Sequence, residues 1–237
     1  MRWEIESPCL RPEDGMDWEN GGLYKPCLLE HQVTYYLFYN AKMKLLAREI
    51  RLARRLDGDS LVLHAGAHSI GNDAHQGLFR FAEGVAQAIS EAGPGPRIVL
   101  ENVPGGGRRM GGTLEELAEL ADLLQRRSIP AGYCLDTAHA WAQGYDIASS
   151  EGMWKFLGAV NRILEADRVA AFHLNDTRAL LGSHRENHWN WGEGHLGADG
   201  LRSLLEREEY RDTPGILETP FGEDTRNLDF ARRLKAD

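Results

Sequence analysis

Short apolar runs alternate with longer amphipathic segments over most of the chain. Five runs each end at a histidine or an acidic residue: SLVLH (60–64), RIVLE (97–101), AGYCLD (131–136), VAAFH (169–173) and GILE (215–218). Continuous apolar runs of this length are typical of parallel strands that are buried on both faces. We therefore predict five buried strands and a weaker sixth strand position near His31.

Between these runs, apolar residues recur with a helical period. The segments that show this pattern are 41–56, 78–92, 113–125, 154–164 and 201–207. Thr113 and Glu116 have the spacing of a capping box, which predicts a helix start at that point. Strands that alternate with helices indicate βα units and a parallel sheet.

The polar residue at the carboxyl end of each strand favours a TIM-type barrel over an open doubly wound sheet, because barrel enzymes build their sites there. Eight units at the observed spacing would need more than 237 residues, and residues 1–30 hold no strand–helix–strand pattern. We therefore predict a single barrel domain over 1–237 with about six βα units. In it, an irregular segment (1–30) replaces the first strands and the metal-binding core spans 31–220.

The composition is that of a globular protein, with 42% hydrophobic and 27% charged residues. Three cysteines without a CxxC pair argue against a disulfide framework and a cysteine-type zinc site, so any metal must be held by His, Asp and Glu. No apolar run is long enough to span a bilayer, and the start lacks an apolar signal core. The expectation is a cytoplasmic protein without a membrane partner.

The strand ends provide a set of side chains that can bind metal. They are His64, Glu101, Asp136, His173 and Glu218. Neutral imidazole and carboxylate are ligands for Zn²⁺, Mn²⁺ and Fe²⁺. A single polar strand end means little, but five in succession predict a metal site. His139, three residues after Asp136, can face the same cavity if a helix begins there, and Glu186 and His188 can point the same way on an extended loop.

At these residues the sequence resembles the endonuclease IV family of apurinic/apyrimidinic endonucleases. The matching stretches are HAGAH (64–68), LENVPGGG (100–107), CLDTAHAWAQGYD (134–146), HLNDT (173–177), ENHWNWGEGHLG (186–197) and ILETP (216–220). The resemblance implies a TIM barrel with three zinc ions. It also implies a phosphoric diester hydrolase that incises damaged double-stranded DNA on the 5′ side of abasic sites, in base excision repair.

The resemblance also implies how the ligands are grouped. The first zinc is expected on His31, His64 and Glu101. Glu101 is expected to act in catalysis as the bridge to a second zinc on Asp136, His173 and Glu218. The third zinc is expected on His139, Glu186 and His188. Mn²⁺ or Fe²⁺ could replace zinc on the same ligand chemistry.

The sequence departs from the family pattern at three places. Glu186-Asn187-His188 stands where the family has Asp-Arg-His. His31 lies in LLEHQVTYYLFYN, where the family has a tighter His-x-x-Tyr-Leu pattern, so Tyr36 and Leu37 match the residues that wedge into DNA only with a shifted spacing. The first two strands and their loops, one of which grips bent DNA in the family, have no counterpart.

The net charge of −9 taken alone argues against a nucleic-acid partner, but three Zn²⁺ ions would offset much of it within the cleft. Arg108, Arg109, Arg178 and Arg185 follow the ligand strands and could contact phosphates or simply be solvated. Trp189 and Trp191 could stack on an extruded nucleotide or pack the loop. The GGG at 105–107 lacks a GxGxxG or GK[ST] context, so no nucleotide cofactor is expected.

Two other functions remain open from the sequence. A sugar isomerase or epimerase on a related barrel could hold one divalent cation with the ligands Glu101, Asp136, His173 and Glu218. That scheme needs neither His64 nor His139, so it ranks second. A non-catalytic module that keeps the ligands but does not cut DNA is the third candidate.

Overall fold

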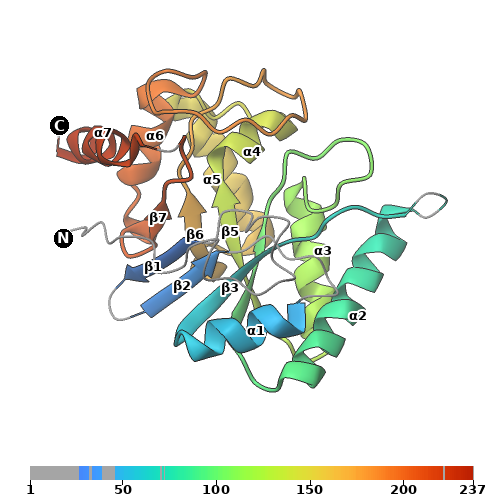
Figure 1. Ribbon diagram of the computed structural model, residues 1–237. Helices are drawn as coiled ribbons and strands as arrows, with labels where there is room; N and C mark the ends of the chain where they lie inside the picture. Colours follow the sequence, from blue (N-terminus) through green and yellow to red (C-terminus); the bar gives the residue numbers. More distant parts are fainter. Residues whose placement is uncertain are drawn as a thin grey trace.

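Seven strands form one sheet whose spatial order is the chain order, β1 to β7 (Figure 1). The computed structural model describes residues 27–31, 34–38, 46–69, 71, 73–220 and 222–236. The strands are β1 (Cys27–His31), β2 (Thr34–Phe38), β3 (Gly58–His64), β4 (Arg97–Glu101), β5 (Ala131–Asp136), β6 (Val169–His173) and β7 (Gly215–Ile216). The five predicted strands are therefore confirmed, β4, β5 and β6 with the expected bounds.

The strand order and direction are those of a barrel that does not close within the described residues. Strands β2 to β7 pair in parallel, each with its neighbour in the chain. No pairing joins β1 to β7 in the part of the chain that the structure describes. The predicted incomplete TIM-type barrel is confirmed.

The N-terminal edge differs from the expected sixth unit. The strand that ends at His31 is β1, and it pairs antiparallel with β2, with His31 opposite Thr34. The strand that runs parallel to β3 is β2, so the sixth βα unit begins at Thr34. Residues 27–30, which we expected to be irregular, belong to β1. A two-residue connection can join only antiparallel strands, because a parallel pair needs a long crossover.

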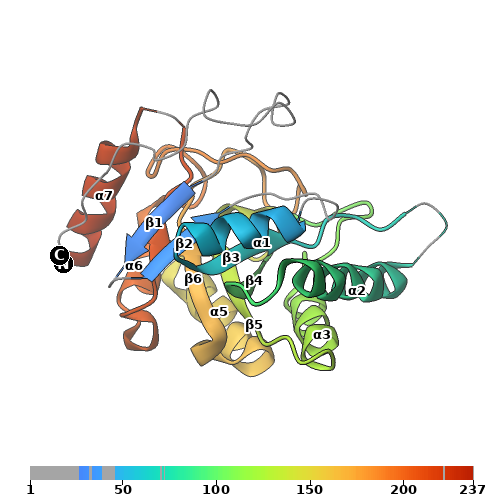
Figure 2. The ribbon, with the colours of Figure 1, turned by 60° about the horizontal axis from the view of Figure 1, so that its bottom comes forward.

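Helices follow the strands and cover the outer side of the sheet, where Figure 2 shows α1, α2, α3 and α5 in succession. The helices are α1 (Leu46–Arg55), α2 (Ala74–Ala92), α3 (Leu114–Gln125), α4 (Thr137–Gln143), α5 (Ser150–Leu164), α6 (Gly197–Leu205) and α7 (Asp224–Ala236). The five predicted helices are confirmed with shifted ends. None of the described helices combines the length and apolar character needed to cross a bilayer.

The start of α3 shows a modified capping box. The Thr113 hydroxyl accepts the Glu116 N–H at 3.1 Å, as predicted. The Glu116 carboxylate accepts the N–H groups of Gly111 and Gly112, both at 2.9 Å, instead of the N–H of Thr113. Glu116 thus fixes the end of the loop that follows β4 as well as the helix start.

Two apolar layers separate the inside of the barrel from the outside. The outer layer packs the helices against side chains such as Leu61 and Leu63 of β3. The inner layer is small, and β3 to β7 each contribute one buried residue to it: Val62, Val99, Cys134, Ala171 and Ile216. Because strand side chains alternate between faces, every second residue from these positions also points into the barrel.

The loop between β6 and α6 is held by one buried carboxylate, that of Asp176, which has no measurable exposure. Its two oxygens accept four backbone N–H groups at 2.7–3.1 Å, from Thr177, Gly192, Gly194 and Leu196. The Asp176 carbonyl also accepts the N–H of Trp189 at 2.7 Å. These bonds fix the backbone of residues 189–196 to the residues that follow β6.

We expect Asp176→Ala to lower the free energy of unfolding by about 3 kcal/mol, because four buried N–H groups lose a charged acceptor. Chemical denaturation followed by circular dichroism measures this loss. The exposed Asp212 provides the matched control, and Asp212→Ala should change stability by less than about 0.5 kcal/mol. Equal stability of the two variants would contradict the proposed role of the Asp176 bonds.

Candidate metal centre

The five strand-end residues converge on the inner side of the barrel because of the two-residue period of the strands. Each lies two positions after a residue of the inner layer, as His64 follows Val62 and Glu101 follows Val99. The parallel register places the ends side by side, with His64 opposite Glu101 and Asp136 opposite His173. The same spacing from Ile216 leads to Glu218, just beyond β7.

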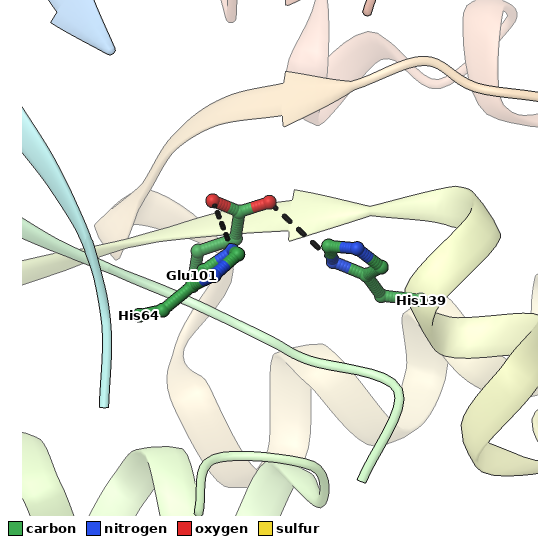
Figure 3. A group of neighbouring side chains, drawn as sticks. All are labelled: His64, Glu101 and His139. Atoms are coloured by element: carbon green, nitrogen blue, oxygen red, sulfur yellow. Dashed lines mark ion pairs between the residues drawn. The ribbon is translucent and has the colours of Figure 1, made fainter. Parts of the chain in front are cut away.

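Glu101 lies at the centre of the cluster, and Figure 3 shows its two oxygens facing different histidines. Glu101 Oε2 lies 2.9 Å from His64 Nε2. Glu101 Oε1 lies 2.8 Å from His173 Nδ1 and 3.5 Å from His139 Nδ1. A buried carboxylate that presents one oxygen to each of two ligand groups has the arrangement needed to bridge two cations.

A second set of ligand atoms gathers around His173. Its Nδ1 lies 3.1 Å from Glu218 Oε2 and 3.8 Å from Asp136 Oδ2, in addition to its contact with Glu101. Ligand atoms of Glu101, Asp136, His173 and Glu218 all lie within 4.8 Å of one another. Three carboxylates and one imidazole at this spacing form a site for a divalent cation.

A third set includes two histidines whose ring nitrogens face each other. His139 Nε2 and His188 Nε2 are 3.3 Å apart, and His188 Nε2 lies 3.5 Å from Asp136 Oδ2. The Nδ1–H of His139 donates to the carbonyl of Asn102 at 2.9 Å, so Nε2 is the nitrogen that faces His188 and that can bind a cation after it loses its proton. Two nitrogens bound to one tetrahedral zinc at about 2.0–2.1 Å lie about 3.3 Å apart. The residues present therefore fit a zinc ion.

Two buried asparagines hold Asp136 and Glu218 in place by hydrogen bonds. The Asn175 amide donates to Asp136 Oδ2 at 2.7 Å, and its oxygen accepts the Glu218 N–H at 2.8 Å. Asn102 exchanges two hydrogen bonds with the backbone of Asp136, at 2.7 and 3.1 Å. Such partners fix the direction of ligand lone pairs and commonly set metal affinity.

The electrostatics of the cluster favour positive charge. Burial alone would raise the pKa of Glu218, but His173 lowers it to about 2. Burial would likewise lower the pKa of His139, yet Asp136 and Glu101 raise it to about 9. Acids that stay ionised and histidines that hold protons describe a site with an excess of negative charge, to which protons or cations bind.

Seven of the nine predicted metal ligands come together in these groups: His64, Glu101, Asp136, His139, His173, His188 and Glu218. Glu186 is exposed and lies outside the three groups, although its charge contributes to the raised pKa of His139. Asp136 is the carboxylate beside His139 and His188. The side chain of His31, like those of Tyr36 and Leu37, lies outside the described residues.

The expected DNA-contacting side chains divide into two kinds. All four arginines, Arg108, Arg109, Arg178 and Arg185, are exposed, but Arg178 and Arg109 also make contacts within the chain. The Arg178 guanidinium lies 3.6 Å from the centre of the Trp189 ring, whose Nε1 donates to Glu193 at 3.1 Å. Arg109 is committed to two backbone carbonyls.

Trp191 packs the loop. It is buried, stacks on Phe230 and donates its indole N–H to the Leu174 carbonyl at 2.9 Å. The alternative in which Trp191 stacks on an extruded nucleotide is therefore wrong, because its ring is already covered by the core.

Sequence reasoning did not single out Asn102, Asn175 or Asp176. Asn102 directly follows β4, Asn175 and Asp176 lie two and three residues after the end of β6, and all three belong to the stretches LENVPGGG and HLNDT. A polar residue just beyond a ligand strand was the available signal. Pattern alone cannot show whether such a residue ligates, orients a ligand or holds a loop.

The family model described as a xylose isomerase-like TIM barrel matches residues 38–234. A probable endonuclease 4 of Solibacter usitatus is 39% identical over 191 residues, which cover 78% of this chain and 66% of that protein. A probable endonuclease 4 of Halothermothrix orenii is 32% identical, with 81% and 69% covered. The chain thus spans about two thirds of the length of these relatives.

Solved structures agree with the sequence comparison. The endonuclease IV of Thermus thermophilus superposes with a TM-score of 0.71 at 34% identity, covering 81% of this chain and 67% of that one. A D-tagatose 3-epimerase-like protein superposes with a TM-score of 0.58 at 18% identity, which shows a shared fold alone. On the family match and these relatives, the chain belongs to the endonuclease IV family of xylose isomerase-like TIM barrels.

Proposed function

We propose that this protein is a zinc-dependent endonuclease that hydrolyses the DNA phosphodiester on the 5′ side of abasic sites, in base excision repair. The observation that carries the proposal is that three ligand groups share members pairwise. The first group is His64, Glu101 and His139, the second is Glu101, Asp136, His173 and Glu218, and the third is Asp136, His139 and His188. The carboxylate of Glu101 therefore joins the first group to the second, and that of Asp136 joins the second to the third. Separate sites would share no ligands, whereas a multinuclear cluster requires shared ones.

The chemistry of the proposed reaction matches this cluster. Bound divalent cations would supply a nucleophile from water near neutral pH and neutralise charge on the phosphate and the leaving oxygen. The chain itself would hold the cations: Glu101 presents one oxygen to each neighbouring group, and Asn175 fixes the Asp136 carboxylate beside the other ligands. No serine or cysteine nucleophile is needed, and burial raises the pKa of Cys134 to about 12, so its thiol stays protonated.

The single-cation isomerase remains the second candidate, because Glu101, Asp136, His173 and Glu218 alone suffice for one ion. It leaves the facing pair of His139 and His188 without a role. Two imidazole nitrogens that converge at 3.3 Å over a buried carboxylate are explained by a further cation. The number of bound ions therefore separates the two functions.

We expect the purified protein to bind three zinc ions per chain, and His188→Ala to bind about one fewer, because the third group loses a nitrogen ligand. Inductively coupled plasma mass spectrometry after dialysis measures the content. His75 provides a control, since its side chain is 72% exposed and pairs with Glu119 on the surface. His75→Ala should keep the wild-type content. A wild-type protein with a single ion would support the isomerase instead.

We expect the zinc-loaded protein to cut a duplex that contains one abasic site and to leave a 3′-hydroxyl on the upstream fragment. Chelation should abolish cutting, and readdition of zinc should restore it. Glu101→Gln should reduce kcat by at least about 10²-fold, because the neutral amide cannot bridge two cations. Denaturing gel electrophoresis of an end-labelled strand measures the rate.

Glu83→Gln, an exposed substitution on α2, is the matched control for loss of a carboxylate and should cut at the wild-type rate. Full zinc content without incision would reject the endonuclease and leave the non-catalytic module. Incision that survives both chelation and Glu101→Gln would show that the described cluster is not the active site.

A further inference from the structure

Two loops beside the metal centre are joined into one surface, which we call the rim. The first loop follows β4 (residues 104–112), and the second follows β6 (residues 178–188). Arg109 donates to the carbonyls of Gly105 and His184, both at 2.7 Å. The His184 ring donates to the Pro104 carbonyl at 2.8 Å. In Figure 1 the second loop belongs to the orange segment that extends over α4, at the end of the sheet where the ligands gather.

Within the rim, a tight turn over residues 180–183 is firmly anchored to α4. The Trp141 carbonyl accepts the Gly182 N–H at 3.1 Å, and the Trp141 indole donates to the Ala179 carbonyl at 2.9 Å. The Ser183 N–H closes the turn on the Leu180 carbonyl at 3.1 Å. This helix also carries His139, so the turn is fixed relative to the metal ligands.

The tip of this anchored turn is apolar. Leu180 is 68% exposed and Leu181 is 43% exposed. The other large apolar side chains exposed in the described structure are Phe79, over which the Arg127 guanidinium lies, and Trp154 on α5. Leu180 and Leu181 are therefore the only adjacent pair among them, and a fixed turn holds them in solvent. An apolar group that is preorganised and uncovered marks a contact surface.

The positive charge of the rim favours a partner that carries negative charge. Its two loops contain four arginines (Arg108, Arg109, Arg178 and Arg185) and one acidic residue, Glu186, in a chain whose net charge is −9. A basic surface on an acidic protein is complementary to a phosphate backbone. An apolar pair flanked by arginines matches the proteins that insert side chains between base steps while they hold the flanking phosphates.

We propose that Leu180 and Leu181 form a wedge that enters the DNA duplex at the gap left by a missing base, while the exposed Arg108 and Arg185 of the rim contact the neighbouring phosphates. This inference rests on the proposed function, because it assigns the damage preference of that same site to this turn. An abasic site has already lost one set of stacking contacts, so an apolar side chain enters it at a lower cost than it enters an intact stack. The wedge thus favours abasic over undamaged DNA without reading sequence.

The test compares Leu180→Ser/Leu181→Ser with wild type in binding to abasic and undamaged duplexes of the same sequence. A non-hydrolysable phosphonate on the 5′ side of the abasic site separates binding from cutting, and fluorescence anisotropy measures the dissociation constant Kd. We expect the double variant to bind the abasic duplex about tenfold more weakly, and thereby to lose most of its preference over undamaged duplex. Trp154→Ser, which removes a side chain that is 62% exposed away from the rim, should keep the preference.

Leu180→Met/Leu181→Met should also keep the preference, because it preserves an apolar tip. Unchanged abasic binding by the serine variant would overturn the wedge, as would an equal loss on both duplexes. Wild-type self-association that the serine variant abolishes would also overturn it, since a second copy would then be the partner. Incision is measured separately: a wedge-dependent preference without incision would reject the proposed function alone, and incision with an unaffected serine variant would reject the wedge alone.

Discussion

The structure depends on a constraint at the carboxyl ends of the parallel strands, where several negatively charged side chains lie close together. Three carboxylates, those of the buried Glu101 and Asp136 and the partly buried Glu218, approach one another around the buried His173. Such a group is costly to bury unless positive charge accompanies it. The backbone cannot relieve the cost, because the parallel register and the two-residue period fix where each side chain points. Positive charge, from protons on His139 and His173 or from bound cations, is thus the physical condition under which this barrel end is stable.

Sequence alone predicted the strands that build this end, because their constraints are local. β4, β5 and β6 are continuous apolar runs that stop at a charged or histidine residue, and both bounds were correct. The helix Asp224–Ala236 was missed, since its sequence is strongly polar. α4 was foreseen only as a condition, because seven residues are too few to show a helical period.

Long-range relations were harder to predict. The antiparallel pairing of β1 with β2 depends on a two-residue connection within LLEHQVTYYLFYN, where apolar residues run through both strands and the turn. The part played by Asp136 beside His139 and His188 was likewise hidden. Adjacent sequence suggested Glu186 as the carboxylate, but the loop geometry set by Asp176 leaves Glu186 exposed and directs His188 inward. Spacing identifies candidate ligands, whereas tertiary packing decides the groups.

The distribution of the ligands separates metal assembly from DNA recognition. All members of the three groups lie between His64 and Glu218. They are at the ends of β3 to β6, just beyond β7, on α4 and in the loop that the Asp176 carboxylate holds. None of them requires a strand on the N-terminal side of β3, so the part of the relatives' length that this chain does not match is not needed to form the cluster. Contacts that orient a long duplex act over a wider surface than one cavity. Among the described residues beside the ligands, the two loops that Arg109 ties together carry four arginines and one acidic residue, so they offer the positive charge that such contacts need.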